Sequence, residues 1–400
     1  MSDLLRDIVE AESLARFQAA GPVKHGLPAE AYTSQRFFEL EQDRVFARSW
    51  TLCGFAHELP SAGDVMPVTV AGRPIVLVRG KDGLLRAFHN VCRHRGLKLV
   101  DTPCSGRRRL VCPYHNWSYA LDGRLINATN FGGHGVHVVE GFDYETHGLA
   151  EVPCRQWHDW IFVNVAGNEP DFERFLAPLL QHLDGIDLGR IEYLYKIDSG
   201  IFECNWKFIC ENFIEPYHVP VVHPETAAGQ PLDQHYMVGD DHLVGCAVDV
   251  EGNGAGKPAK PGKPAKSGDR HARDLCLDIS ARYLLLFPNF LFFIYFGEET
   301  HINVMLNVPL AAGQTHQRRV IYQLGGTRPP EETIEGWRAL TDDVIAEDRA
   351  MVERLQEGRR SPVLADGGVL SPVWEASERA FQDLIMAAVL GPSEVRPNGG

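Results

Sequence analysis

Short runs of alternating apolar and polar residues fill the chain between residues 45 and 165 and predict β-strands. Such runs occur at Val65–Val70, Pro74–Val78 and Leu84–Phe88. Turn-forming residues, most of them glycine beside aspartate or alanine, separate the runs at positions 63–64, 71–72, 81–83 and 122–123. This pattern predicts an all-β domain over residues 45–165.

Longer strands and helices are predicted farther along the chain. Strand-like runs occur at Ile201–Trp206, Tyr283–Phe287, Phe290–Tyr295, His301–Pro309 and Arg319–Leu324. Helical periodicity appears at about 172–183, 331–357 and 373–389. Strands and helices in this order favour an α+β domain with an antiparallel sheet over residues 166–395. Residues 1–44 predict an N-terminal helical segment.

Residues 251–273 interrupt the pattern with glycine, proline and lysine, as in Lys257-Pro-Ala-Lys-Pro-Gly-Lys-Pro-Ala-Lys266. A segment of this composition cannot bury enough apolar surface to order itself. We therefore expect a disordered loop here.

Composition places the chain among cytoplasmic globular proteins. Its 400 residues suit two domains, and its net charge of −14 makes nucleic acid an unfavourable partner. The longest apolar run, Leu284–Phe296, has thirteen residues and contains Pro288, so it is too short to cross a membrane. Nine irregularly spaced cysteines and the lack of a secretory signal favour free thiols in a reducing cytoplasm.

The first group of candidate metal ligands consists of two short motifs. Cys92-Arg-His94 and Cys112-Pro-Tyr-His115 are separated by seventeen residues. Zinc fingers pair cysteine with cysteine and histidine with histidine, whereas each motif here carries one of each. This interleaving favours a Rieske [2Fe–2S] centre, in which two histidines hold one iron and two cysteines the other. A zinc site and unligated surface residues are the alternatives.

The second group is Glu215-Pro-Tyr-His218 followed by His223. Two histidines and one carboxylate on one face hold Fe(II) in non-haem oxygenases and leave positions open. A spacing of five does not stack two side chains on a regular helix. Pro220 and Pro224 predict a broken helix that lets the second histidine turn inward. Two ordinary polar histidines are the alternative.

With both motifs present, the chain resembles the terminal oxygenase, or α subunit, of Rieske non-haem iron oxygenases. Electron-transport Rieske proteins usually carry an additional cysteine in each cluster loop, where Leu97 and Tyr114 stand here. The resemblance covers roughly residues 28–390. It implies that the α+β chain consists of an all-β Rieske domain followed by a helix-grip catalytic domain with a curved antiparallel sheet.

The resemblance also assigns the remaining site residues. The family's third iron ligand is an aspartate after a glutamate on a late helix, which Asp348 matches, with Asp342 and Asp343 as fallback candidates and a solvated helix acid as the alternative. Asn212 lies in the segment similar to the family's iron-binding segment and is a candidate catalytic residue. The loop 251–273 would lie near the active-site mouth, where a lid is the alternative to disorder.

Glu215 is the second candidate catalytic residue. The family usually has aspartate three residues before the first iron histidine, hydrogen-bonded to that histidine and to a cluster histidine of the neighbouring subunit. Glutamate at this position resembles the branch containing carnitine monooxygenase and glycine betaine demethylases. A surface glutamate before Pro216 is the alternative.

The implied activity is oxygenation of a small molecule by a multicomponent enzyme. The expected cofactors are a [2Fe–2S] cluster and mononuclear Fe(II), and O2 is the expected co-substrate. NAD(P)H and flavin are expected on a separate reductase. The chain is expected to form a homotrimer whose partner is a reductase or ferredoxin. The preferred reaction is N-demethylation or C–N cleavage of a quaternary or tertiary amine, and the alternative is cis-dihydroxylation of an arene. A Rieske electron carrier and a zinc-binding structural protein are the remaining alternatives.

Two further features bear on the ligands of this enzyme. Aromatic residues of the strand region are expected to supply cation–π contacts to an amine, with about half of them facing inward: Phe287, Phe290, Phe292, Phe293, Tyr295 and Phe296. Basic residues flank the cluster motifs and could dock an acidic redox partner: Arg93, Arg95, Lys98 and Arg107–Arg109. Ordinary core packing is the alternative for the aromatic residues. A solvated turn or a patch that meets the neighbouring subunit is the alternative for the basic residues.

Overall fold

The computed structural model describes residues 5, 7–168, 170–224, 230–249, 280–296 and 300–391. The predicted loop 251–273 lies outside these residues. The chain forms two compact units, one of Phe46–Phe172 and one that combines Met1–Val45 with Glu173–Gly400. No helix in the described ranges is both long enough and apolar enough to span a membrane.

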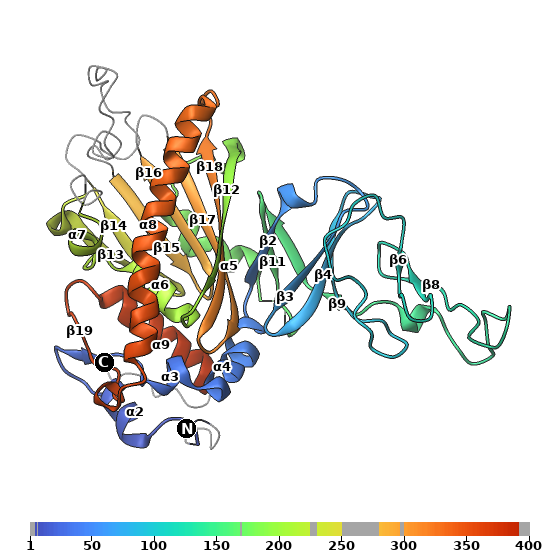
Figure 1. The fold of residues 1–400 in the computed structure, drawn as a ribbon, viewed down its shortest axis with the longest axis horizontal. Coiled ribbons are helices and arrows are strands. Elements are labelled where there is room, and N and C mark those ends of the chain that lie inside the picture. The colour runs from blue at the N-terminus through green and yellow to red at the C-terminus, as the bar shows by residue number, and fades with distance from the viewer. Residues whose placement is uncertain are drawn as a thin grey trace. The chain divides into compact units, whose positions relative to one another are not determined.

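The unit Phe46–Phe172 consists of three small antiparallel sheets (Figure 1). The first has the order β10-β11-β2, from Cys154–Trp157, Trp160–Val163 and Thr51–Phe55. The second has the order β3-β4-β5-β9, from Val65–Val70, Arg73–Arg79, Leu85–His89 and Glu151–Val152. The third has the order β6-β7-β8, from Leu110–Val111, Ser118–Tyr119 and Leu125–Asn127. The three strands predicted between residues 65 and 88 are therefore confirmed within one or two residues.

One hydrophobic cluster joins the second and third sheets of this unit. It contains Val76, Phe88 and Trp117 and encloses both Cys92 and Cys112. The predicted turn after β7 is tight against this cluster. Gly123 has φ +90°, and a Cβ there would meet the Phe88 ring at 2.5 Å, so only glycine fits without rearrangement.

The larger unit is built on a seven-stranded antiparallel sheet with the order β12-β18-β17-β16-β15-β14-β13. Its strands are Ile191–Phe202 (β12), His235–Asp240 (β13), Leu243–Val248 (β14), Ser280–Leu286 (β15), Phe290–Phe296 (β16), Thr300–Ala311 (β17) and Gln314–Leu324 (β18). The expected strands near residues 283, 290, 301 and 319 are confirmed, with longer bounds for several. Strands β13 and β14 were not predicted.

The predicted strand Ile201–Trp206 is wrong beyond Phe202, because β12 ends there and a helix starts at Trp206. The reason is a local cap. The Asn205 side chain accepts a hydrogen bond from the backbone N–H of Lys207 at 3.0 Å, which satisfies a free donor at the start of the helix.

The helices of the larger unit are α2 to α9, together with one short two-stranded pairing. Their bounds are Ala11–Phe17 (α2), Glu30–Thr33 (α3), Gln35–Glu41 (α4), Phe172–Gln181 (α5), Trp206–Ile214 (α6), Val219–Val222 (α7), Glu331–Gly358 (α8) and Ala376–Leu390 (α9). A π-helical turn spans Gln42–Phe46, and β1 (Lys24–His25) pairs with β19 (Val369–Leu370). The N-terminal segment is thus several short helices and a short strand.

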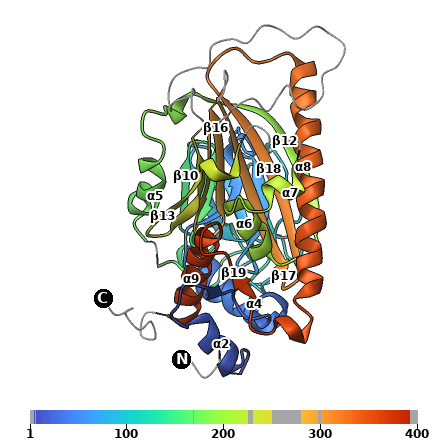
Figure 2. The same cartoon turned by 90° about the vertical axis from the view of Figure 1, so that its left-hand side faces the viewer.

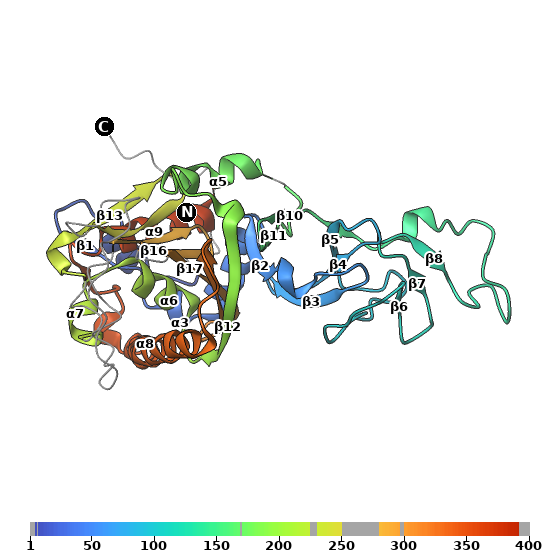
Figure 3. The same ribbon diagram turned by 90° about the horizontal axis from the view of Figure 1, so that it is seen from above.

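Three helices pack against the large sheet. Helix α8 runs beside the edge strand β12 (Figure 2), while α9 packs on β13 and β14. Seen from above, α6 lies between α8 and the central strands (Figure 3). Because α7 follows α6 directly in the chain, this packing brings the histidine motif and α8 into one region.

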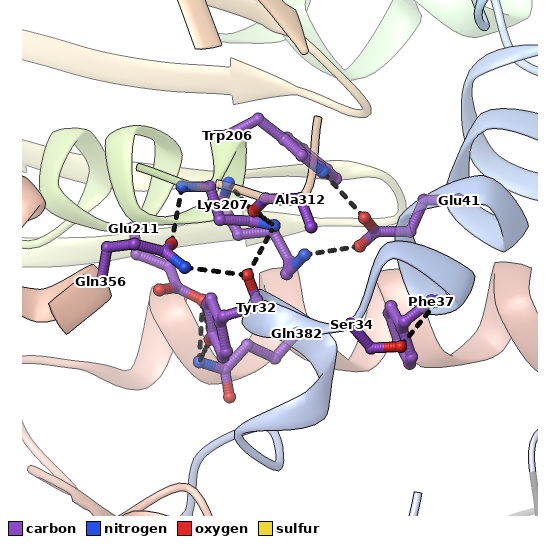
Figure 4. A network of polar contacts seen from close by, with 11 residues as sticks. Tyr32, Ser34, Phe37, Glu41, Trp206, Lys207, Glu211, Ala312, Gln356 and Gln382 are labelled. Carbon is purple, nitrogen blue, oxygen red and sulfur yellow. Dashed lines mark hydrogen bonds and ion pairs between the residues drawn. The ribbon is translucent and has the colours of Figure 1, made fainter. Parts of the chain in front are cut away.

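A buried polar network ties the N-terminal segment to these helices (Figure 4). Lys207 of α6 and Glu41 of α4 form a 2.7 Å ion pair, and neither side chain is exposed. Nearby, the Tyr32 hydroxyl donates to Glu211 at 2.6 Å, and Gln382 of α9 donates to the same carboxylate at 3.0 Å. Buried polar groups of this kind need partners, so the network specifies how the N-terminal segment docks on the rest of the larger unit.

Candidate metal sites

The two cysteine–histidine loops of the smaller unit have the same backbone geometry. The N–H of Cys92 donates to Leu97 at 2.8 Å, and the N–H of Cys112 donates to Trp117, also at 2.8 Å. The fourth residue after each cysteine, Gly96 or Asn116, has a positive φ of 77° or 56°. The loops are therefore matching turns, and each presents one thiol and one imidazole.

The four side chains of these loops converge. Cys92 and Cys112 are 2% and 1% exposed, and their thiols are close enough to interact. The His94 and His115 rings lie 4.7 Å apart between centroids. Within the described chain, Nδ1 of His94 is buried without a hydrogen-bond partner, which fits a nitrogen that binds a metal. Two sulfurs and two nitrogens are the donor set that a Rieske cluster requires.

Neighbouring groups support this first site. Trp117 stacks on the His94 ring at 4.8 Å, and Tyr114 lies against His115 at 3.8 Å. The Tyr119 hydroxyl is 3.3 Å from Cys92 Sγ and accepts the N–H of Arg93 at 2.9 Å. Hydrogen bonds to ligand sulfur are one of the means by which proteins tune the potential of such clusters.

The second site is formed where the helix after β12 breaks. Helix α6 ends at Ile214, and α7 spans only Val219–Val222, with His218 and His223 as its caps. His223 has φ −119° and ψ 57°, so the chain leaves the helix at this residue. The interruption lets both rings approach each other at 5.3 Å between centroids, although the residues are five apart.

Asp348 of α8 completes a group of three potential ligands. One ligand atom from each of His218, His223 and Asp348 lies within 4.8 Å of the others. Nε2 of His223 is 2.9 Å and Nε2 of His218 is 3.8 Å from the same Asp348 oxygen, Oδ1. Two imidazoles and one carboxylate are the donor set of mononuclear non-haem Fe(II), so the residues fit that metal. The fallback residues Asp342 and Asp343 lie outside this group.

Each member of this group is held by a further polar side chain. Nδ1 of His218 pairs with Oε1 of Glu215 at 2.5 Å, and Asn212 donates to Asp348 Oδ1 at 2.9 Å. Partners of this kind fix the orientation of a ligand ring and the tautomer that it adopts.

Glu347 is the supporting residue that sequence reasoning missed. Its Oε2 is 2.6 Å from Nδ1 of His223. The only signal in the sequence was its position directly before Asp348.

The charges of this site favour an ionised carboxylate. Burial raises the pKa of Asp348, but the hydrogen bond and charge of His223 outweigh burial, and the net pKa is lowered. Burial lowers the pKa of His223, but its hydrogen bonds and charge interactions with Asp348 and Glu347 outweigh this, and its net pKa is raised.

Aromatic side chains line the sheet face that α6 covers. Tyr283 stacks on Phe293 with centroids 4.3 Å apart, and Phe213 of α6 meets Tyr283 at 5.9 Å. Tyr295 lies 5.2 Å from Phe293 on the same face. Strand alternation places Phe290, Phe292 and Phe296 on the opposite face, where Arg282 already covers Phe296.

Comparison with known proteins identifies both domains. Residues 183–391 match the family described as the catalytic domain of the ring-hydroxylating alpha subunit, and residues 49–140 match the Rieske [2Fe-2S] domain. The matched catalytic domain covers more than half of the chain. The order of the two domains and the antiparallel sheet of the second confirm the predicted α+β class, a Rieske domain followed by a catalytic domain.

Curated relatives match over shorter stretches. The oxygenase subunit of glycine betaine monooxygenase from Chromohalobacter salexigens is 38% identical over 202 residues, which are 50% of this chain and 44% of that protein. The oxygenase subunit of carnitine monooxygenase from Escherichia coli K12 is 32% identical over 240 residues, 59% of this chain and 61% of that protein. The chain spans about half the length of the curated relatives that it matches.

Solved structures match over nearly the whole chain. A quaternary ammonium Rieske monooxygenase in complex with γ-butyrobetaine superposes with a TM-score of 0.74 at 25% identity, covering 93% of this chain and 97% of that one. A naphthalene 1,2-dioxygenase with bound indole has a TM-score of 0.67 at 20% identity, covering 92% of each, and shares the fold. The sequence resemblance is thus confirmed, and the chain belongs to the ring-hydroxylating alpha subunit family of Rieske oxygenases.

Proposed function

We propose that this chain is the oxygenase component of a multicomponent Rieske oxygenase that oxidises a small quaternary or tertiary amine. The grouping of His218, His223 and Asp348 carries this proposal, because it is an Fe(II) donor set within a ring-hydroxylating catalytic domain. A [2Fe–2S] cluster would be held by Cys92, His94, Cys112 and His115. When bound, the cluster supplies single electrons and Fe(II) activates O2.

The protein's own residues would orient the ligands and the substrate. Glu215, Glu347 and Asn212 fix the two imidazoles and the carboxylate, as their hydrogen bonds indicate. Tyr283 and Phe293 offer ring faces to an ammonium group, which aromatic side chains bind through cation–π attraction. The carbon–nitrogen chemistry would then take place at an N-methyl group held between the aromatic face and the metal ligands.

The overall reaction balances with two electrons from a reductase. One O2, two electrons and two protons convert an N-methyl group to an N-hydroxymethyl group and one water. The carbinolamine then loses formaldehyde and leaves the demethylated amine, with release of a proton where the substrate is quaternary. Hydroxylation at another carbon would instead lead to cleavage of a different C–N bond. NAD(P)H and flavin would reside on the separate reductase.

A second candidate is an arene dioxygenase that forms a cis-dihydrodiol. The description of the family and the shared fold of naphthalene 1,2-dioxygenase favour it, and the aromatic face would also accept an apolar ring. The relatives named for betaine and carnitine favour the amine.

We also propose that the chain works as a cytoplasmic homotrimer with a reductase or ferredoxin as partner. A related quaternary ammonium monooxygenase is described as transferring electrons between subunits. In such an assembly, Glu215 would bond to His218 of its own chain and to His115 of the partner subunit. The exposed Arg107–Arg109 would dock the redox partner, so turnover should fall with salt. None of the cysteines in the described ranges forms a disulfide, which suits a reducing compartment.

The proposed function is tested with purified protein, a reductase and a panel of substrates. Betaines and carnitine should give formaldehyde or a C–N cleavage product in proportion to NAD(P)H consumed, whereas benzoate-like acids and naphthalene should not give diols. Asp348→Ala should keep the cluster spectrum, lose iron from the second site and lose product formation. Diol formation without amine oxidation would refute the amine proposal. Retention of second-site iron by Asp348→Ala would refute the ligand assignment.

A further inference from the structure

The helix-covered face of the sheet contains a buried arginine that the metal sites do not use. Met305 of β17 pairs with Arg319 of β18, and Asn303 pairs with both Phe293 and Ile321. Because side chains alternate along a strand, Arg319, Asn303 and Phe293 point to the same face. Arg319 is only 7% exposed, as is Asn303.

The guanidinium of Arg319 is oriented but mostly unpaired. Its Nε donates to Oε1 of Gln317 at 2.9 Å, and Gln317 donates onward to Asn307 Oδ1 at 3.1 Å. Across the described part of the chain, its two terminal nitrogens have no hydrogen-bond partner, and no carboxylate lies within ion-pair distance of it. Oδ1 of Asn303 is likewise buried with no partner in those residues.

A buried charge without a partner is costly, so this arrangement calls for an anion. An ion in a protein interior loses its hydration, and without a partner of opposite charge nothing compensates that loss. Arginine presents a planar fork that matches the two oxygens of a carboxylate. The Gln317 contact leaves the terminal nitrogens available for that fork.

Arg319 lies in the same interior as the candidate iron ligands. The charges of Asp348 and Asp342 on α8 both interact with it. Burial lowers the pKa of Arg319 to about 10, so the guanidinium remains charged at neutral pH. Asp348 is not its hydrogen-bonded partner, because that carboxylate is engaged by His223 and Asn212.

The spacing of the strands suits a small molecule with charges at both ends. Arg319 stands on β18 and Phe293 on β16, with β17 between them. Neighbouring strands are about 4.8 Å apart, so the two side chains rise from one face of the sheet on backbones roughly 10 Å apart, a separation that a small molecule with two charged ends can span.

We propose that Arg319 binds the carboxylate of the substrate and makes the site specific for zwitterionic amines over amines with an uncharged end. This inference rests on the proposed amine oxidation and specifies its substrate class. The ammonium end would lie on the Tyr283 and Phe293 rings, and Asn303 would offer its free oxygen nearby. The residue is a specificity determinant and takes no part in the chemistry at the metal.

The experiment compares ligands that differ only in the carboxylate. Calorimetry measures the Kd of γ-butyrobetaine and of its methyl ester for the holoenzyme, with glycine betaine and choline as a second pair. The variants are Arg319→Gln and Arg319→Lys. The control is Arg318→Gln, an adjacent arginine that strand alternation places on the opposite face.

The wild type should bind each carboxylate more tightly than its uncharged-end partner, even though the chain's net charge of −14 would favour the cationic ester. Arg319→Gln should raise the Kd of the carboxylates by about 30-fold or more, the range for loss of one partner of a buried charge pair, and change that of the esters by less than about threefold. Arg319→Lys should give an intermediate Kd, and Arg318→Gln should bind as the wild type.

Several outcomes would overturn the inference. Equal losses for acid and ester in Arg319→Gln would show a structural role. If that variant does not fold, a wild type that binds the ester as tightly as the acid would also overturn it. A wild type that binds neither betaines nor esters would instead refute the proposed amine oxidation, which separates the two failures.

Discussion

Both ring nitrogens of His223 face carboxylates of α8: Nδ1 is 2.6 Å from Glu347 and Nε2 is 2.9 Å from Asp348. Two consecutive acids on one helix therefore fix the plane of a single imidazole. Asp348 and Nε2 of His223 would bind the same metal. Glu347 would accept the N–H of Nδ1 and so keep Nε2 deprotonated and available as a ligand.

We predict that Glu347→Ala lowers the affinity of the second site for Fe(II) by about 10- to 100-fold, the usual effect of removing such a partner. The measurement is iron retained against a competing chelator, with the cluster spectrum as an internal reference. Asp343→Asn, at an exposed acid of α8, serves as the control and should retain iron as the wild type does. Equal iron retention by Glu347→Ala and the control would show that Glu347 is only a surface acid.

The parts of this architecture that depend on local pattern could be predicted from the sequence. Short apolar runs such as Val65–Val70 are bounded by turn residues, and the prolines around His218 and His223 indicated a broken helix. Asp348 was predictable only through family resemblance, because 125 residues separate it from His223.

Other features depend on long-range contacts and could not be predicted. Strands β13 and β14 are short and contain glycines, so their alternation is weak. The strand predicted at Ile201–Trp206 failed because a side-chain cap at Asn205 outweighed an apolar run. The burial of Arg319 without an acid partner among the described residues depends on strand register and long-range packing, which a sequence does not display.

A second prediction concerns the buried ion pair of Lys207 and Glu41, whose side chains are fully inaccessible. Burial lowers the pKa of Lys207 and raises that of Glu41, while their mutual attraction opposes both shifts. Removing one partner leaves the other charge uncompensated, so Lys207→Met should cost about 3–5 kcal/mol of unfolding free energy.

The double variant Lys207→Met with Glu41→Leu should cost less than Lys207→Met alone, because apolar residues of similar size can replace a buried pair. Chemical denaturation of the two single variants and the double variant measures this coupling. Additive losses would show that the two residues stabilise the protein independently.

A third prediction concerns His301, which is buried beside Trp337 of α8 at 4.3 Å between ring centroids. Burial lowers its pKa to about 4 from an ordinary value of 6.5. Below pH 6.5 the unfolded chain therefore gains a proton that the folded chain does not accept until about pH 4. Stability that is present above pH 6.5 is lost progressively as the pH falls through this window.

His301→Gln should remove that contribution. Between about pH 6.5 and pH 5, the unfolding free energy of the variant should therefore fall by roughly 2 kcal/mol less than that of the wild type, at about 1.36 kcal/mol per pH unit. Calorimetric unfolding at the two pH values measures the difference. His134→Gln, at an exposed histidine, should follow the wild type. Parallel acid losses in the wild type and His301→Gln would mean that this histidine does not govern the acid sensitivity.

The last prediction concerns Glu215, which orients His218 through its Oε1 and accepts the backbone N–H groups of Tyr217 and His218 through its Oε2. If its carboxylate also reaches His115 of the partner subunit, removing it should separate two sites that each remain intact. Glu215→Ala should therefore show a normal cluster spectrum and normal reduction by the reductase, but almost no substrate-dependent reoxidation. Glu215→Asp keeps the charge on a side chain one methylene shorter, so its activity should be intermediate.

Mixing two inactive chains tests whether this link crosses a subunit interface. Glu215→Ala retains its cluster ligands, and Cys112→Ser retains Glu215 and the second-site residues. In a head-to-tail ring, a heterologous interface places one chain's cluster loops next to its neighbour's second site, so each mixed trimer contains one productive pair. Because a wild-type ring has three such pairs, mixed trimers should regain roughly a third of wild-type activity. Unmixed samples of either variant should stay inactive. If verified mixed trimers stay inactive as well, Glu215 does not connect neighbouring subunits, and its role is confined to orienting His218 within its own chain.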